Sequence, residues 1–558
     1  MRARLVTLAT AALLAVPATG ALPQATPAAL GCAPGTQLRN DWTTLGRDRC
    51  VPLGDLDAGR DLMARAALEA GYSGDSETHL EAVAGYQAML ARAEADRAQS
   101  GRADFRTSAG QVVRGSGHAW RQLGPTPTHA TDPKYSPSVL GWDRLAGRVT
   151  TLAVDPRDRS GNTVYLGAAA GGVWKTTNGG KTWQHLSATF ATESIGSIAV
   201  EANSGYVYVG TGEGNTNGDA YFGTGLYRST NGGRTWTRRP GLPRNAVIPH
   251  VEVRNNFVYV ATSRGLYRSA NKGDSFHSAP LPTGGSAPNR QSLGNFVSDV
   301  RIRPSDVKEV TAAVGWRSGG ISGAGLYRSL DAGVTWTRLP AIGLGVNPVD
   351  GQSADPIGRV SLAYAAAEQG PILWAVVQDP GKLNNENNPI AFTGPRQLPP
   401  SNLNGIYRSG DDGLTWILKG GYHQFENPAT APGSSLNILG TSLYGPGIQA
   451  WYNQYVAVDP TNVDRVVVGL EEIYETVAGA NTPVGEAEWR VVGRYWNNCG
   501  GLVATEPYGC PPAPIIYSAK TTHPDQHAAA FAMLASGASR IYVGNDGGAY
   551  RQDIDPTT

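Results

Sequence analysis

Long runs of one charge are missing from this 558-residue sequence, whose net charge is +1. Nucleic-acid-binding surfaces need clustered cations to neutralise phosphates, so this balance does not favour DNA or RNA as a partner. After the first residues, the sequence also lacks any run of roughly 18 apolar residues, the length that a membrane span requires. With 41% hydrophobic and 17% charged residues, the composition is typical of a soluble globular protein.

Cysteine is scarce, with four residues in two pairs that are close in sequence: Cys32 with Cys50, and Cys499 with Cys510. In an exported chain, this arrangement predicts two local disulfides, Cys32–Cys50 and Cys499–Cys510. Metal binding is the alternative, but the sequence has no Cys-x-x-Cys motif to support it. We expect neither a metal nor another cofactor.

The first 21 residues have the pattern of a secretory signal peptide. Arg2 and Arg4 precede a short apolar run, and small residues follow around Ala18 to Ala21. A membrane anchor is the alternative, but Pro17 interrupts the apolar run. We therefore expect a secreted, extracellular protein with no membrane span after cleavage.

Residues 22–115 differ in composition and hydrophobic pattern from the rest of the chain. Two alanine-rich stretches between residues 55 and 100 carry apolar residues at three- and four-residue spacing, which predicts two amphipathic helices. No residue in them suggests chemistry, so we interpret this region as a helical pro-region or spacer.

Glycine and proline are abundant, with 71 and 37 residues, which predicts many turns and short strands over residues 116–558. One line of sequence recurs in this part. It reads "GVWKTTNGGKTW" at 172–183, "GLYRSTNGGRTW" at 225–236, "GLYRSANKGDSF" at 265–276, "GLYRSLDAGVTW" at 325–336 and "GIYRSGDDGLTW" at 405–416.

The recurring line has the chemistry of a hairpin turn. Its Asp or Asn can accept backbone N–H bonds inside the turn, and its glycine can adopt a positive φ. The aromatic residue that ends the line is large enough to fill a gap between neighbouring sheets. We therefore assign the line a structural role and look for chemistry elsewhere.

The spacing of the repeat predicts a β-propeller. The shortest distance between successive terminal aromatics is that between Trp236 and Phe276, and such a unit of about 40 residues with four strands is a propeller blade. Two further units are degenerate, and the last has only three strands. A strand around Trp120 can supply the missing one by pairing near Tyr550. The fold class is thus all-β, a seven-bladed β-propeller preceded by a short α-helical region.

The long insertions of this propeller fall on one face. The strands of a blade alternate in direction, so the loops after second and fourth strands emerge opposite the repeated turn. The insertions at 211–225, 378–405, 420–453 and 493–524 all belong to these two loop types. Insertions confined to one face of a repeat array are typical of its binding face.

Carboxylates and aromatic residues gather at the strand ends of that face, as a sugar-binding cleft requires. The candidate catalytic acids and bases are Glu213, Glu471, Glu472, Asp525 and Asp546. The candidate substrate-binding residues are Arg148, Tyr221, Trp316, Arg317, Arg359, Trp451 and His527. The alternative is that these polar groups satisfy one another around the central channel.

The densest cluster lies in "HPDQH", which contains His523, Asp525 and His527. Residues at alternate positions of a strand share one face, so the spacing predicts that the three side chains point together. They would form either an acid/base or metal cluster, or a hydrogen-bonded plug at the inner end of the blade.

The turn "STNGGRTW" resembles the Asp-box, also called the bacterial neuraminidase repeat. The units that contain it, such as "VTTLAVDP" with "GVWKTTNGGKTW", resemble secreted bacterial Asp-box propellers. This group includes sortilin-type propellers, photosystem II assembly propellers and xyloglucan-cleaving glycosidases. The resemblance covers about residues 120–558 and implies the fold more sharply than an activity.

Carried over residue by residue, the resemblance gives mixed indications. Xyloglucanases place a catalytic Asp before Gly-Gly in the first blade, where this chain has Ala169 and Ala170. The stretch "YVGNDGGAYR" does keep Asp546 before a Gly-Gly pair, but in the last unit. A sialidase is disfavoured, since "VRIRPSD" at 300–306 only partly matches the motif that sialidases carry.

Three functions remain compatible with the sequence. The first is a glycoside-hydrolase-like enzyme that acts on an extracellular polysaccharide. The second is a non-catalytic module that binds a glycan, a glycoprotein or another protein. The third is an enzyme of another type that uses the His523–His527 cluster. In each case we expect a monomer.

Overall fold

The computed structural model describes most of residues 144–554 and five short strands before them. Within 144–554, the described part leaves out residues 216–219, 244, 282–295, 318–322, 341–356, 381–401, 422–424, 426–447, 477–488 and 494–521. The expected signal peptide, helices, Trp120 strand and disulfides therefore lie outside the described residues. No helix of the described part is long and apolar enough to cross a membrane.

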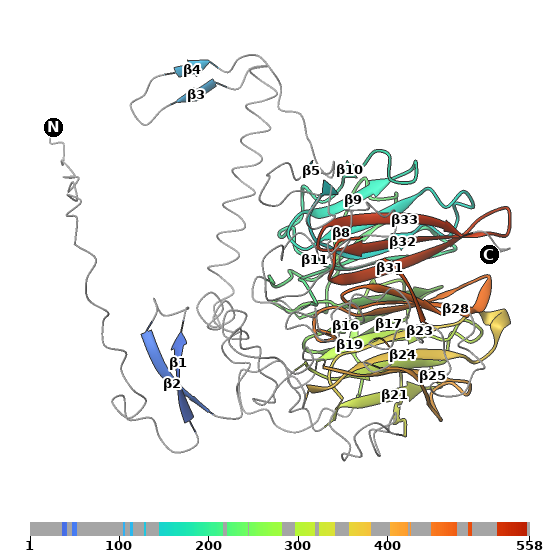
Figure 1. The fold of residues 1–558 in the computed structure, drawn as a ribbon. Coiled ribbons are helices and arrows are strands. Elements are labelled where there is room, and N and C mark those ends of the chain that lie inside the picture. The colour runs from blue at the N-terminus through green and yellow to red at the C-terminus, as the bar shows by residue number, and fades with distance from the viewer. Residues whose placement is uncertain are drawn as a thin grey trace, which may run out of the picture.

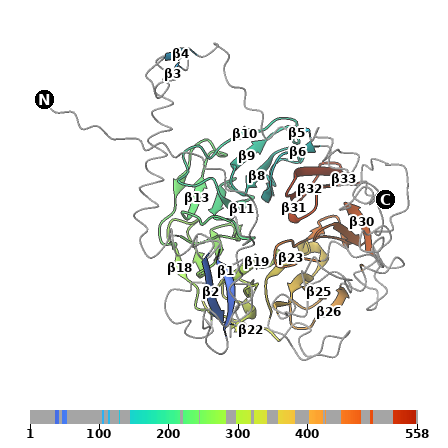
Figure 2. The same ribbon diagram turned by 60° about the vertical axis from the view of Figure 1, so that its left-hand side comes forward.

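Seven antiparallel sheets, here called blades one to seven, are arranged around a common centre (Figures 1 and 2). Blades one to three comprise β7 (Val149–Val154), β8 (Val164–Ala168), β9 (Gly172–Thr176) and β10 (Gln184–His185); β11 (Ile195–Val200), β12 (Val207–Thr211), β13 (Leu226–Ser229) and β14 (Thr237–Arg238); and β15 (His250–Arg254), β16 (Phe257–Thr262), β17 (Gly265–Ser269) and β18 (His277–Ser278).

Blades four to six also have four strands each. They comprise β19 (Val297–Ile302), β20 (Val310–Val314), β21 (Gly325–Ser329) and β22 (Thr337–Arg338); β23 (Val360–Tyr364), β24 (Leu373–Gln378), β25 (Leu403–Ser409) and β26 (Ile417–Gly420), with the short 3-10 turn η5 (Ala367–Gln369); and β27 (Tyr455–Asp459), β28 (Asn462–Gly469), β29 (Ile473–Thr476) and β30 (Trp489–Gly493).

Blade seven has three strands among the described residues: β31 (Gln526–Met533), β32 (Ser539–Asn545) and β33 (Gly548–Ile554). Three two-stranded sheets account for the other strands: β1 (Thr36–Asp41) with β2 (Arg47–Pro52), β3 (Asp104–Arg106) with β4 (Val112–Arg114), and β5 (Thr128–His129) with β6 (Arg144–Leu145). The prediction of an all-β, seven-bladed propeller is confirmed.

Blade seven joins blade one and closes the ring. Strand β31 packs against both β27 and β7. The Tyr542 hydroxyl donates a hydrogen bond to the Gly161 carbonyl (2.8 Å), and the Ala146 amide donates one to the Gly547 carbonyl (2.7 Å). The chain that leads into blade one is thereby bonded to the β32–β33 turn.

The core lies between the blades. Strands such as β12, β20 and β24 are buried along their whole length, because each sheet is covered by a neighbouring blade on both faces. In one cluster, Tyr165 and Val173 of blade one pack with Ile195 and Val207 of blade two. These three strands consist mainly of Val and Ala.

The repeated turn has the hydrogen bonds that its sequence predicts. In blade four, Asp331 Oδ1 accepts bonds from the amides of Val334 (3.0 Å) and Thr335 (2.8 Å), and the Ser329 hydroxyl accepts one from Gly333 (2.7 Å). Gly333 has a φ of 83°, in the region that favours glycine. The other four turns use the same bonds through Asn178, Asn231, Asn271 and Asp411.

Replacing Asp331 by Ala should lower the melting temperature and leave binding at the opposite face unchanged, because the turn loses the acceptor that holds its amides. Asp331→Asn is the matched control, since Asn makes the same backbone bond in blades one to three. Differential scanning calorimetry of the two variants checks this. If Ala and Asn gave the same melting temperature as the parent, the side chain would not stabilise the turn.

A second structural device links the blades at their inner strands. The Thr150 hydroxyl of blade one donates to the Ile195 carbonyl of blade two (2.6 Å), and the Ser197 hydroxyl donates to the Ile248 carbonyl before blade three (2.9 Å). Further on, the Ser298 hydroxyl accepts from the Val360 amide of blade five (3.2 Å). These bonds fix the inner strand ends, which hold the candidate site.

Candidate functional site

Asp546 lies at the centre of a hydrogen-bonded group on the insertion-bearing face. It occupies the turn between β32 and β33, before Gly547 and Gly548, and is partly exposed. His527 Nε2 lies 2.6 Å from Asp546 Oδ1, and the Tyr452 hydroxyl lies 3.1 and 3.0 Å from its two oxygens. The carboxylate is therefore held by two side chains from different blades.

Two further side chains extend this group towards blade two. Arg148 donates through Nη1 to the Tyr452 hydroxyl (2.7 Å), and its Nε lies 3.2 Å from Glu213 Oε1. The Tyr452 hydroxyl accepts from arginine, so its own proton can be donated to Asp546. The result is a continuous chain of contacts from a buried glutamate to the partly exposed Asp546.

These contacts determine the charge of Asp546. Burial alone would raise the pKa of this carboxyl, but the hydrogen bond and charge of His527, together with the charge of Arg148, lower it below its usual value. The opposite holds for Tyr452, since burial and the nearby Asp546 raise the pKa of its hydroxyl. Asp546 is thus an anion at neutral pH, and Tyr452 is a neutral donor.

The pKa of Asp525 shifts in the opposite direction to that of Asp546. It precedes β31 with a φ of 65°, and its Oδ1 accepts a bond from Asn453 Nδ2 (2.5 Å). Burial and the negative charge of Asp546 raise the pKa of Asp525 to about 6. Two coupled carboxyl groups whose environments move their pKa values apart form an acid and base pair in glycosidases.

Glu471 contacts the same side-chain amide as Asp525, that of Asn453. Asn453 Nδ2 lies 3.2 Å from Glu471 Oε1, which also accepts from the Gln449 amide. Burial and the charge of Asp525 raise the pKa of Glu471 well above its usual value. Asn453 occupies the space between Glu471 and Asp525, so these two carboxyl groups do not flank an open cleft.

The remaining candidates have different surroundings. Glu472 is 0% exposed and accepts from the Tyr474 hydroxyl (2.9 Å), which places it inside blade six. Glu213 is equally buried. Arg317, at 2% exposure, stacks its guanidinium over the Trp451 ring at 4.5 Å and the Trp316 ring at 5.6 Å. Tyr221, at 60%, is an exposed aromatic residue of this face.

Arg359 joins blades two, five and six. It donates through Nη1 to the Tyr452 carbonyl (2.6 Å) and through Nη2 to Asn215 Oδ1 (3.2 Å). Burial lowers the pKa of its guanidinium to about 10, so it remains charged at neutral pH. Arg359 therefore fixes the backbone of Tyr452 while Arg148 contacts its hydroxyl.

The prediction that His523, Asp525 and His527 share one strand face is wrong. Strand β31 begins at Gln526, and the positive φ of Asp525 turns the chain just before it. His523 Nδ1 lies 3.1 Å from the Pro524 carbonyl, and Asp525 and His527 contact Asn453 and Asp546 respectively. In the described part of the chain, no group of three or more such side chains has a metal-binding arrangement.

A β-bulge directs His527. The register of β31 and β32 shifts between Gln526 and Ala528, so His527 is the extra residue. The inner strands of blades one and four have the same irregularity, at Thr150 and Ser298. Bulges often redirect a side chain next to a functional site. In blades one and four, the hydroxyl group of the bulged residue bonds to the next blade. In blade seven, the bulged residue is His527, and its imidazole contacts Asp546.

Sequence reasoning missed Tyr452 and Asn453, the two residues that join blade six to blade seven. Both immediately follow Trp451, just before the first strand of blade six. They lie three and two residues before β27, whereas Arg148 and Arg359 stand directly before β7 and β23, so the repeat register does not select them.

Replacing Asp525 by Asn should stabilise the protein at pH 7 and leave its stability near pH 4 unchanged. Because folding raises the pKa of Asp525 to about 6, the stability it contributes is present below pH 4 and is lost as the pH rises through 6. Asn cannot ionise and tolerates a positive φ. The expected gain at pH 7 is on the order of 2–3 kcal/mol.

Urea denaturation of the parent and Asp525→Asn at pH 4 and pH 7 measures this difference. Asp553→Asn is the control for the same chemical change in blade seven, since Asp553 is 55% exposed and paired with Arg540. A variant destabilised equally at both pH values would show that the hydrogen bond from Asn453 outweighs the charge.

Part of the chain is similar to xyloglucanases, although no family model matches it. A xyloglucanase of Paenibacillus sp is 28% identical over 224 residues, which cover 34% of this chain and 20% of the relative. Xyloglucanase Xgh74A of Acetivibrio thermocellus is 29% identical over 225 residues, covering 34% and 25%. The match thus spans a quarter or less of either relative.

Among solved structures, the crystal structure of an ancestral GH74 enzyme is similar over 74% of this chain and 45% of that chain. The TM-score is 0.47 and the sequence identity is 17%.

Proposed function

We propose that this protein is a secreted, glycoside-hydrolase-like propeller that acts on an extracellular polysaccharide. The observation that carries the proposal is the coupled pair Asp525 and Asp546, whose pKa values move in opposite directions at the insertion-bearing face. Glycoside hydrolysis needs one protonated and one ionised carboxyl group. The similarity to xyloglucanases over part of the chain supports the same class of substrate.

In this proposal Asp525 is the general acid. Its raised pKa keeps it protonated below about pH 6, so it can give its proton to the oxygen that leaves the sugar. Asp546 is the anion, and it either takes a proton from the attacking water or bonds to the anomeric carbon. The anomeric configuration of the first product, measured by NMR, distinguishes these two routes.

The surrounding residues keep Asp546 ionised and in place. His527 and Tyr452 direct donors at both of its oxygens, and Arg148 orients the Tyr452 hydroxyl. Such fixed donors act without reorganising during the reaction.

The pH profile of kcat/KM should fall on the alkaline side above about pH 6, where Asp525 loses its proton.

A polysaccharide panel that begins with xyloglucan tests the proposal, with sugar release and binding scored separately. Release of reducing ends by the purified protein supports it. Tight binding without release favours the second candidate, a glycan-binding or protein-binding module. One observation favours that candidate: Glu213, Glu471 and Glu472 are all at most 2% exposed, which leaves few accessible carboxylates among the described residues of the face.

A further inference from the structure

Glu213 has a fixed place at the start of the insertion in blade two. Its amide donates to the Tyr221 carbonyl (3.0 Å), and Gly212 before it has a φ of 88°, which favours glycine. Gly214 after it packs so closely that an added Cβ would lie 2.6 Å from the Cβ of Pro249. The main chain of Glu213 is therefore held on both sides.

The buried carboxylate of Glu213 faces Arg148. The Glu213 side chain is 1% exposed, and its Oε1 lies 3.2 Å from Arg148 Nε. The same guanidinium donates through Nη1 to the Tyr452 hydroxyl (2.7 Å), which lies 3.1 and 3.0 Å from the two Asp546 oxygens. Because a guanidinium is planar and its donors have a fixed relative geometry, the contact at Nε determines where Nη1 points.

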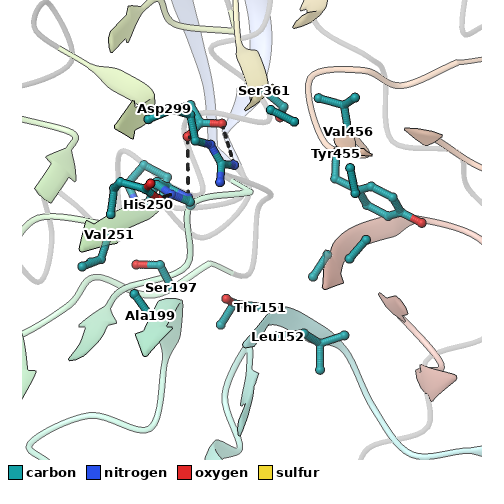
Figure 3. Close-up of a pocket in the computed structure, with 18 of the residues that line it drawn as sticks. Thr151, Leu152, Ser197, Ala199, His250, Val251, Asp299, Ser361, Tyr455 and Val456 are labelled. Carbon is teal, nitrogen blue, oxygen red and sulfur yellow. Dashed lines mark hydrogen bonds and ion pairs between the residues drawn. The ribbon is translucent and has the colours of Figure 1, made fainter. Parts of the chain in front are cut away.

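A second buried cation near Glu213, Arg359, belongs to a different group of charges. Burial lowers the pKa of Arg359, and the negative charge of Asp299 counters this more strongly than that of Glu213. Asp299 lies in the wall of the cavity at the centre of the ring, 3.6 Å from His250 Nδ1 (Figure 3). Of the two cations, Arg148 is the one in ion-pair contact with Glu213.

Ionisable side chains from three blades interact with Asp546. In the described part of the chain they are His523, Asp525 and His527 at blade seven, Tyr452 before blade six and Arg148 before blade one. Burial alone would raise the pKa of Asp546, and His527, Arg148 and Tyr452 together lower it. Displacing Arg148 would therefore raise the pKa of Asp546, whereas loss of the negative charge of Glu213 by itself would lower it.

We infer that Glu213 is a positioning residue, which holds Arg148 in place so that the Tyr452 hydroxyl is directed at Asp546. Its importance for catalysis rests on the proposed function, in which Asp546 reacts as the anion. The role accounts for the burial of Glu213, because a carboxylate that acts through Arg148 does not need to reach the substrate. Its own charge is compensated by the guanidinium, as a buried charge requires.

Glu213→Met tests this inference, because it removes the carboxylate and keeps the length of the side chain. We expect the pKa of Asp546 to rise. We also expect kcat on the polysaccharide to fall by up to about 10²-fold, the effect of misplacing a reacting group by about 1 Å. Carbon-13 NMR of protein labelled at the aspartate carboxyl groups measures the pKa, and the spectrum of Asp546→Asn identifies the signal.

Glu368→Met is the matched control, since Glu368 is exposed in η5, after the first strand of blade five. It should leave both quantities at the parental values. Glu213→Gln removes the charge and keeps the shape of the side chain, so it should fold and shift the pKa of Asp546 in the same direction as Glu213→Met. Melting temperatures establish which variants are folded.

Arg148→Met shows whether the effect passes through Arg148. If it does, replacing Glu213 should not raise the pKa of Asp546 further once Arg148 has been replaced. An equal rise in the presence and absence of Arg148 overturns the inference. A lowered or unchanged pKa of Asp546 in the folded Glu213 variants overturns it as well, because Glu213 would then act by its charge alone or not at all.

The pKa is measured without substrate, which separates this inference from the proposed function. Hydrolysis by the parent protein, with no rise of the pKa in the Glu213 variants, overturns the positioning role and leaves the proposed function standing. A rise of the pKa in a protein that hydrolyses no polysaccharide supports the positioning of Asp546 and contradicts the proposed function.

Discussion

Asp546→Asn should reduce kcat on the polysaccharide by about 10²–10⁴-fold, the range for loss of an acid or base group. The substitution keeps the size of the side chain and one acceptor oxygen, but removes the negative charge. The folded state should survive, because the Asn oxygen can still accept one of the bonds from Tyr452 and His527. Initial rates of reducing-end release, with KM measured in parallel, check the prediction.

Asp553→Asn is again the matched control, because it makes the same chemical change at the outer edge of blade seven. Its rate should equal that of the parent protein. If Asp546→Asn kept the parental rate while its melting temperature was unchanged, Asp546 would have no role in the chemistry. Equal losses in both variants would indicate an effect on blade seven as a whole.

Trp489→Ala should give the largest loss of stability, about 3–5 kcal/mol, the usual cost of removing a buried aromatic side chain. Trp489 is 0% exposed, donates through Nε1 to the Lys419 carbonyl of blade five (2.9 Å) and packs edge-on against Phe425. Its ring also lies against Gly420, where an added Cβ would be 3.0 Å from the indole nitrogen. The indole therefore joins blades five and six.

Trp336→Ala is the comparison variant, since Trp336 ends the repeated line of blade four but is only half-buried. Its indole donates to Gly333 of the same turn, not to a neighbouring blade. Urea denaturation should give a clearly smaller loss for Trp336→Ala. Equal losses would mean that burial of the aromatic residue does not decide how strongly it holds the blades together.

Most of the fold could be predicted because its signal is local. The Asp or Asn, the glycine and the aromatic residue of each turn lie within eight residues, and in all five turns the Asp or Asn makes the predicted bond to a backbone amide. Blade six has lost this turn, yet its four strands and Trp489 are present. Trp489 is more deeply buried than the aromatic residues that end the five repeated lines, which no local pattern indicates.

The candidate site was harder to predict because it depends on contacts between blades. The register correctly placed Asp546 and His527 in one blade, and the two are in contact. It did not reveal that Glu472 points into its own blade, where it meets Tyr474. A residue at a strand end can face the axis or the interior of the sheet, and sequence spacing does not separate these cases.

Closure of the ring by blade seven determines when the candidate site can form during folding. Arg148 lies at the start of blade one, Tyr452 before blade six, and Asp525 and Asp546 at blade seven, which follows the other six blades in the chain. A growing chain that has completed six blades holds neither carboxyl group of the pair. Any activity of this site therefore requires blade seven to have docked against blade one, so we expect a chain that is cut before blade seven to have no activity at this site.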